Sequence, residues 1–154
     1  MRKLLLGVVL GVGALAASVP VIAHHAFGAE FDPNAPLRLK GRIVKVEWVN
    51  PHTWIHIEVD ECSGTVTKCV DAAGKKEVWA VEGGTPNTLL RRGLTRDTLP
   101  AGTVLIVDGY RTKDPTLTRA NGRDVTLESG TKFFMGSSGT GAPRDGRDPT
   151  EPGR

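Results

Sequence analysis

The four histidines of the chain fall into two pairs that could hold a metal ion. His24 and His25 are adjacent, and His52 and His56 lie on either side of Trp54. Imidazole nitrogen suits transition metals, and Cu(II) stands at the top of the affinity order of the divalent ions. We therefore treat these four histidines as candidate metal ligands, with copper as the expected ion.

The residues before His24 have the three parts of a secretory signal peptide. A positive start at residues 1–3 is followed by an uncharged apolar run at residues 4–17, and Val21-Ile22-Ala23 matches a cleavage sequence. The sequence predicts a signal peptide over residues 1–23 and a periplasmic or secreted bacterial protein without a stable membrane anchor. An uncleaved anchor is the alternative, although the apolar run is shorter than the ~20 residues that cross a bilayer.

Cleavage would make His24 the first residue and release its backbone nitrogen as an amine. The amine has an ordinary pKa of about 8 and the imidazole one of about 6.5, so both are available as ligands near neutral pH. His25 would add a second ring nitrogen. This start resembles the N-terminal histidine copper sites of some periplasmic copper-resistance proteins and of lytic polysaccharide monooxygenases, a likeness confined to these residues.

His52 and His56 cannot both bind one ion if they lie on one straight strand. Residues four apart share a face but are separated by ~13 Å. His52 follows Asn50-Pro51 at a strand end, so we expect it, rather than His56, to complete a site begun by His24. The alternative is that His52 and His56 are ordinary solvent-facing strand residues and that residues 24–25 are only a processed end.

Trp54 is a candidate ligand-binding residue on the face of the two strand histidines. An indole ring can stack on a sugar, a base or a partner side chain, and the alternative is cross-strand packing. A second hypothesis is therefore a periplasmic scaffold that docks a protein or a glycan through this face. A third is a copper-dependent redox enzyme. The sequence contains no motif of a known catalytic site, so it favours a binding module and indicates no catalytic residues.

Cys62 and Cys69 are the only cysteines and lie in a polar stretch between two strand-like segments. In an exported protein such a pair predicts a disulfide. The alternative is a metal thiolate pair, but the spacing differs from C-x2-C and no further cysteine is present.

The charge of the chain argues against a nucleic-acid partner. The 20 basic and 17 acidic residues give a formal net charge of +3. Removal of residues 1–23 takes away Arg2 and Lys3 and no acidic residue, which leaves the mature chain nearly neutral. Nucleic-acid binding needs a basic surface.

The elements that must position these residues are short strands. The strand-like segments are residues 37–49, 52–59, 76–82, 103–110 and 123–128, and a short helix is predicted between Thr85 and Gly93. This β-β-β-α-β-β order predicts an all-β domain with one short helix, an OB-like five-stranded barrel. A small β-sandwich or an open meander is the alternative.

Alternation in the second segment separates two faces. The residues expected in the core are Thr53, Ile55, Ile57 and Val59, and those expected on the opposite face are His52, Trp54, His56 and Glu58. Gly41 is expected at a bulge in the first segment.

The domain boundaries follow from composition. We expect the OB-like domain over residues 37–135, preceded by an irregular leader at residues 24–36 that Phe27 and Phe31 pin to it. Asp114-Pro115 and Asn121-Gly122 are expected to bound a loop before the fifth strand. Residues 136–154 are rich in Gly and Pro and lack an apolar run, so we expect a disordered tail.

Several separated motifs resemble a known family. They are H-H-A-F at residues 24–27, W-V-N-P-H-T-W-I at 48–55, G-T-P-N-T-L-L-R-R-G at 84–93, D-G-Y-R-T-K-D at 108–114 and F-x-G-S-S-G at 134–139. In this combination the chain resembles a family of small exported bacterial proteins of unknown function. The resemblance implies export and an OB-like barrel, and it implies no activity. The cysteine pair lies outside this pattern, so the disulfide is expected to be a feature of this chain rather than of the family.

Overall fold

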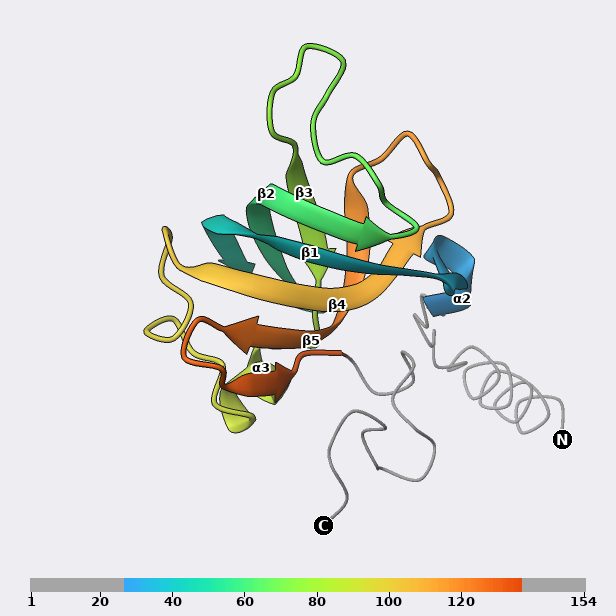
Figure 1. The fold of residues 1–154 in the computed structure, drawn as a ribbon. Helices are drawn as coiled ribbons and strands as arrows, with labels where there is room; N and C mark the ends of the chain where they lie inside the picture. The colour runs from blue at the N-terminus through green and yellow to red at the C-terminus, as the bar shows by residue number, and fades with distance from the viewer. Residues whose placement is uncertain (1–26, 137–154) are drawn as a thin grey trace, which may run out of the picture.

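The computed structural model describes residues 27–136, which form one strongly curved β-sheet with two short helices (Figure 1). The elements in chain order are α2 (Phe27–Glu30), β1 (Phe31–Trp48), β2 (Thr53–Gly64), β3 (Val78–Glu82), α3 (Pro86–Arg91), β4 (Val104–Thr112), β5 (Arg119–Leu127) and β6 (Lys132–Phe134). Neither helix has the length and apolar character needed to cross a bilayer.

The sheet closes on itself in a ring. Its strand order is β3-β2-β1-β4-β5-β6, and β3 also pairs with β5, in parallel, through three residue pairs. All the other pairings are antiparallel. The all-β class is confirmed, with the main helix between the third and fourth strands. The ring is a single sheet rather than two facing sheets, and its short closing seam makes it less regular than a simple barrel.

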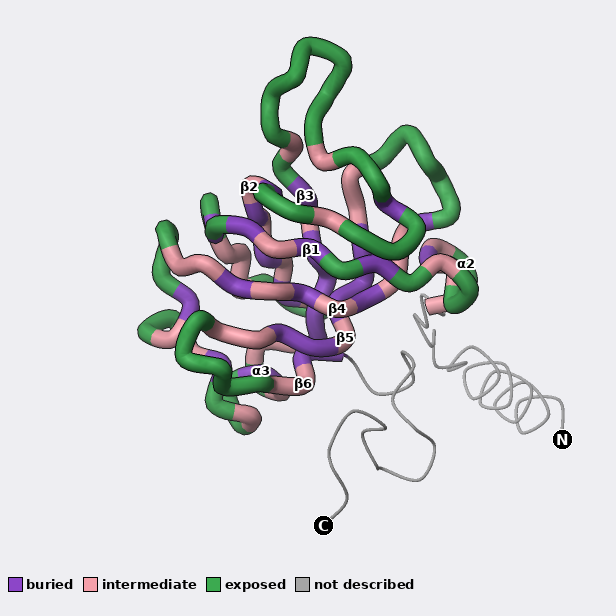
Figure 2. The backbone as a smooth tube through the Cα atoms, in the orientation of Figure 1, coloured by how far each residue is buried: buried purple, intermediate pink, exposed green. Residues whose placement is uncertain are grey.

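The core fills the inside of the ring. Ile55, Ile57 and Val59 of β2 are at most 1% exposed, as alternation predicts. Burial of each such side chain stabilises the fold by about 1.5–3 kcal/mol. Figure 2 shows the buried residues concentrated along the strands, whereas the long connection between β2 and β3 is mostly exposed.

The predicted bulge at Gly41 is confirmed. The β1–β2 register shifts between Lys40 and Gly41. A Cβ at Gly41 would lie 2.2 Å from the carbonyl oxygen of Glu58, so no larger residue fits without movement of the backbone.

The described part of the predicted irregular leader, residues 27–36, is regular secondary structure instead. Residues 27–36 form α2 and the beginning of β1. Phe31 is 2% exposed, and the ring of Phe27 contacts the rings of Phe31 and Tyr110. Pairing of Phe31 with Thr112 extends the sheet past Pro33 and Pro36, at the cost of a register shift. Residues 24–26 lie outside the described part of the chain, as does the predicted tail after Gly136.

The prediction of a loop that runs as far as Asn121-Gly122 is wrong. β5 begins at Arg119, because residues 119–121 pair with β3 on one side and the strand pairs with β4 from Ala120 onward on the other. Gly122 serves close packing rather than a turn: a Cβ there would lie 2.6 Å from Sδ of Met135. Lys132–Phe134 form a sixth strand, β6, beyond the five that were predicted, and it returns antiparallel to β5.

The predicted disulfide and helix are confirmed. Cys62, near the end of β2, is bonded to Cys69 with a Cα–Cα distance of 5.9 Å. The disulfide excludes the thiolate metal pair. The hydroxyl of Thr85 accepts a hydrogen bond from the backbone N–H of Thr88 and so caps α3.

Candidate functional site

The side of β2, β3 and β5 that faces away from the core around Trp54, together with the adjoining end of β1, carries a set of side chains that we call the Trp54 face, some of them exposed and some covered. Strand pairing arranges them in two rows across the sheet. One row is Glu47, Trp54, Glu82 and Asn121, and the other is Lys45, His56, Ala80 and Arg119. Because neighbouring strand residues alternate, the residues between them, such as Ile55 and Val81, face the core.

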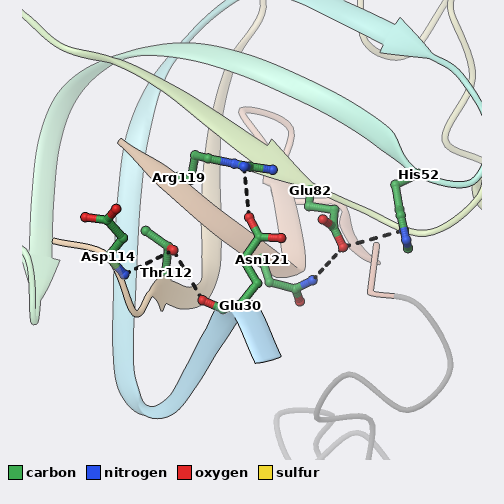
Figure 3. Close-up of polar contacts among 7 residues, drawn as sticks. All are labelled: Glu30, His52, Glu82, Thr112, Asp114, Arg119 and Asn121. Atoms are coloured by element: carbon green, nitrogen blue, oxygen red, sulfur yellow. Dashed lines mark hydrogen bonds and ion pairs between the residues drawn. The ribbon is translucent and has the colours of Figure 1, made fainter. Parts of the chain in front are cut away.

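Arg119 covers the indole ring at the centre of this face. Its guanidinium carbon lies 4.6 Å from the ring centroid of Trp54, within cation–π distance. Nη1 of Arg119 is also 3.0 Å from a carboxylate oxygen of Glu30 in α2 (Figure 3). The ion pair and the stack together join α2, β2 and β5.

Helix α2 is further fixed by its last carbonyl group. The carbonyl oxygen of Glu30 accepts hydrogen bonds from the backbone N–H of Lys113, at 2.8 Å, and from the hydroxyl of Thr112, at 3.2 Å. The same hydroxyl accepts a long bond from the backbone N–H of Asp114 (Figure 3). The beginning of the described chain is therefore held beside the Trp54 face.

Two hollows open on either side of the Trp54–Arg119 stack. The His52 pocket, of about 300 Å³, is lined by Glu30, Val49, Asn50, Pro51, His52, Trp54, Glu82 and Arg119. The His56 pocket, of about 230 Å³, is lined by Glu47, Trp54, His56, Ala80 and Arg119. The methyl side chain of Ala80 leaves space between the larger residues around it.

His52 contacts two oxygen atoms through one ring nitrogen. Nδ1 lies 3.3 Å from the carbonyl oxygen of Gly83 and 3.5 Å from Oε1 of Glu82. Glu82 is 8% exposed, and its Oε1 lies 3.5 Å from Nδ2 of the fully buried Asn121. Figure 3 shows Glu82 between His52 and Asn121.

His56 contacts a carboxylate through its other nitrogen. Nε2 lies 3.0 Å from Oε1 of Glu47, but it is buried and its N–H does not point at that oxygen, so the contact is electrostatic rather than a well-directed hydrogen bond. Burial lowers the pKa of His56, as does the charge of Lys45, and Glu47 opposes both. Lys45, 2.5 Å from Glu47, lowers the pKa of that carboxyl group.

The structure separates the two strand histidines that the sequence singled out. His52 and His56 line different pockets, with the Trp54–Arg119 stack between them. His24 and His25 lie outside the described residues. Within residues 27–136 no three His, Cys, Asp or Glu side chains are grouped as metal ligands would be.

Several charged or polar residues of the site were not singled out as site residues from the sequence, among them Glu30, Glu47, Glu82, Arg119 and Asn121. Alternation along the third predicted strand could have placed Glu82 on the outer face. No local signal could have placed Arg119 and Asn121 there, because they reach the face through the parallel pairing of β5 with β3.

The chain belongs to a family of unknown function (DUF6152), which it matches over residues 13–121. This membership confirms the resemblance to an uncharacterised family. No curated protein and no solved structure shows a significant match to the chain.

Proposed function

We propose that this member of the family of unknown function is an exported binding module for Cu(II). One observation supports the proposal most directly. His52 lines a pocket together with Glu30, and only five residues separate Glu30 from His24 along the chain. The processed N-terminus is thus separated by only a short length of chain from the pocket that the strand-end imidazole lines.

Export is part of the proposal. The disulfide between Cys62 and Cys69 is typical of an oxidising compartment. A signal peptide over residues 1–23 would take the chain to such a compartment, and its removal after Ala23 would release the amine of His24.

The proposed ligands are the amine and imidazole of His24, completed by His25 or His52. An extended residue spans ~3.5 Å, so six steps of chain place residue 24 within ~20 Å of Glu30. The His52 pocket is inside that reach. Cu(II) accepts such amine and imidazole nitrogens in a tetragonal arrangement. His56 is the less favoured completing ligand, because Glu47 already contacts its Nε2.

The test uses the exported protein. Mass spectrometry should report His24 as the first residue, and titration against a competing chelator should give a sub-micromolar Kd for Cu(II). His24→Ala should weaken the affinity more than about 100-fold, since residues that only orient metal ligands already contribute about 10–100-fold.

A sharp control is the double variant His24→Ala/His25→Ala, which keeps the amine and removes both imidazoles that can chelate an ion together with it. It should lose at least as much affinity as His24→Ala does. Equal affinity in the wild type and in both variants, or no sub-micromolar binding by correctly processed protein, contradicts the copper proposal.

Docking of a protein or glycan through the Trp54 face is the second candidate. In folds of this strand order the surface of the second and third strands is a common ligand-binding face, and both pockets open there.

Titration of ¹⁵N-labelled protein with neutral, amino and acidic oligosaccharides should shift the Trp54 indole signal. Trp54→Ala should abolish the binding and His24→Ala should leave it unchanged; no shift with any sugar contradicts the glycan form of this candidate.

A further inference from the structure

We infer that Glu82 and the carbonyl group of Gly83 hold His52 in one tautomer, so that Nε2 is the nitrogen that the His52 pocket offers to a ligand. The identity of the ligand, Cu(II), rests on the proposed function. The tautomer rests only on the geometry around the ring.

The argument starts from the two atoms nearest to Nδ1. The Gly83 carbonyl oxygen, at 3.3 Å, can only accept a hydrogen bond, and an ionised Glu82, at 3.5 Å, can also only accept. Nδ1 must therefore carry a proton to interact favourably with either. In a neutral imidazole the other nitrogen, Nε2, then keeps a free electron pair.

The other ring nitrogen of His52, Nε2, is available to a ligand. The side chain of His52 is 23% exposed and lines the pocket, and no residue of the described chain contacts its Nε2 through a hydrogen bond or ion pair. Its lone pair therefore has room for a Lewis acid or a hydrogen-bond donor.

Both acceptors are fixed by the sheet. The backbone N–H of Gly83 donates to the carbonyl oxygen of Thr53 at 2.8 Å, and the N–H of Thr53 donates to Gly84 at 3.0 Å. These bonds attach the end of β3 to the residue after His52. Asn121 contacts the Glu82 carboxylate from the other side, at 3.5 Å, and is itself fully buried.

This arrangement is the one that metal-binding histidines use. Such a histidine usually donates its non-coordinating N–H to a carboxylate or a carbonyl group, which orients the ring and raises the basicity of the coordinating nitrogen. Nδ1 of His52 has a carbonyl group within hydrogen-bond distance and a carboxylate beside it at 3.5 Å. Glu82 is accordingly a positioning residue and His52 the ligand.

The first measurement needs no substitution. Long-range ¹H–¹⁵N NMR of metal-free, histidine-labelled protein, above the titration range of imidazole, distinguishes the two tautomers by their nitrogen shifts. We expect the Nδ1–H form for His52, although an imidazole in water prefers the proton on Nε2. Observation of the Nε2–H form overturns the inference.

The second measurement tests the positioning role. Glu82→Gln keeps the shape of the side chain and removes its charge, so the Nδ1–H population should fall and the Kd for Cu(II) should rise about 10–100-fold. Glu58→Gln is the control: it removes a carboxylate of β2 that lines neither pocket, and it should leave the His52 tautomer and the Kd unchanged. Equal affinity in Glu82→Gln and the wild type overturns the positioning role.

The two proposals can fail separately. A wild-type protein that shows the Nδ1–H tautomer and does not bind Cu(II) contradicts the proposed function and supports the assignment of Nε2 as the open nitrogen. A protein that binds Cu(II) with His52 in the Nε2–H form supports the function and overturns the assignment.

Discussion

The two histidine–glutamate pairs of the Trp54 face use the same residue types and present opposite nitrogens. At His52 the oxygens lie against Nδ1 and leave Nε2 open, whereas at His56 the carboxylate of Glu47 lies against Nε2. Both histidines have side chains that are about one-fifth exposed. The exposed fraction of the side chain therefore does not distinguish the two histidines. The position of the oxygen atoms around each ring does.

Strand register produces this difference. Glu47 lies opposite Trp54 on β1, which makes it the diagonal neighbour of His56. His52 precedes β2 and meets the end of β3, where a backbone carbonyl as well as a carboxylate is available. A histidine at a strand end can thus be oriented by a main-chain carbonyl group. Within a strand, such groups are occupied by the hydrogen bonds of the sheet.

The largest expected effect comes from removing each histidine in turn. His52→Ala should weaken Cu(II) binding more than about 100-fold, equivalent to about 2.8 kcal/mol, because loss of a ligand exceeds the loss of the residue that orients it. His56→Ala should change the affinity less than about twofold, because its pocket is on the other side of the Trp54–Arg119 stack. Competition titration of both variants measures the difference, and equal losses would erase the distinction between the pockets.

A smaller effect is expected where the two pockets meet. Arg119→Gln removes the ion pair with Glu30 and the stack on Trp54, both partly screened by solvent, and should reduce the free energy of unfolding by about 0.5–1 kcal/mol. Urea denaturation measures this loss. Arg38→Gln is the control, since its pair with Asp108 is more exposed and should contribute less; an equal loss in both variants would mean that the stack adds nothing.

The smallest expected effect is a pH dependence that belongs to His56. Because its pKa in the folded protein is lowered below 6.5, the unfolded chain binds the proton more readily. The contribution of the neutral ring to stability should be complete above pH 6.5 and should be lost as the pH falls through the folded pKa. Comparison of unfolding free energies with those of His56→Gln from pH 7.5 to pH 5 tests this, and parallel profiles would contradict it.

The sequence was sufficient to predict the parts of this comparison that depend on local pattern. Alternation along β2 placed Trp54 and His56 on one side and the apolar residues on the other, and the structure agrees. The disulfide and the capped helix α3 also followed from short-range signals.

The partners of the histidines could not be predicted in the same way. Glu82 becomes a partner of His52 only when β3 pairs with β2, and Arg119 reaches Trp54 only when β5 pairs with β3. The Asn121-Gly122 pair is a turn signal locally, but long-range pairing and packing against Met135 place it inside a strand. Tertiary contacts therefore decided which nitrogen of each ring is open.

The anchoring of α2 has a consequence for any donor near the start of the mature chain. With Glu30 fixed at the pocket, a group on residue 24 is confined to a sphere of ~20 Å radius rather than to bulk solution. Short tethers of this kind give effective concentrations in the millimolar range. An amine at that residue would therefore meet an ion in the His52 pocket as if it were present at millimolar concentration, and lengthening the chain between residues 24 and 30 would dilute it.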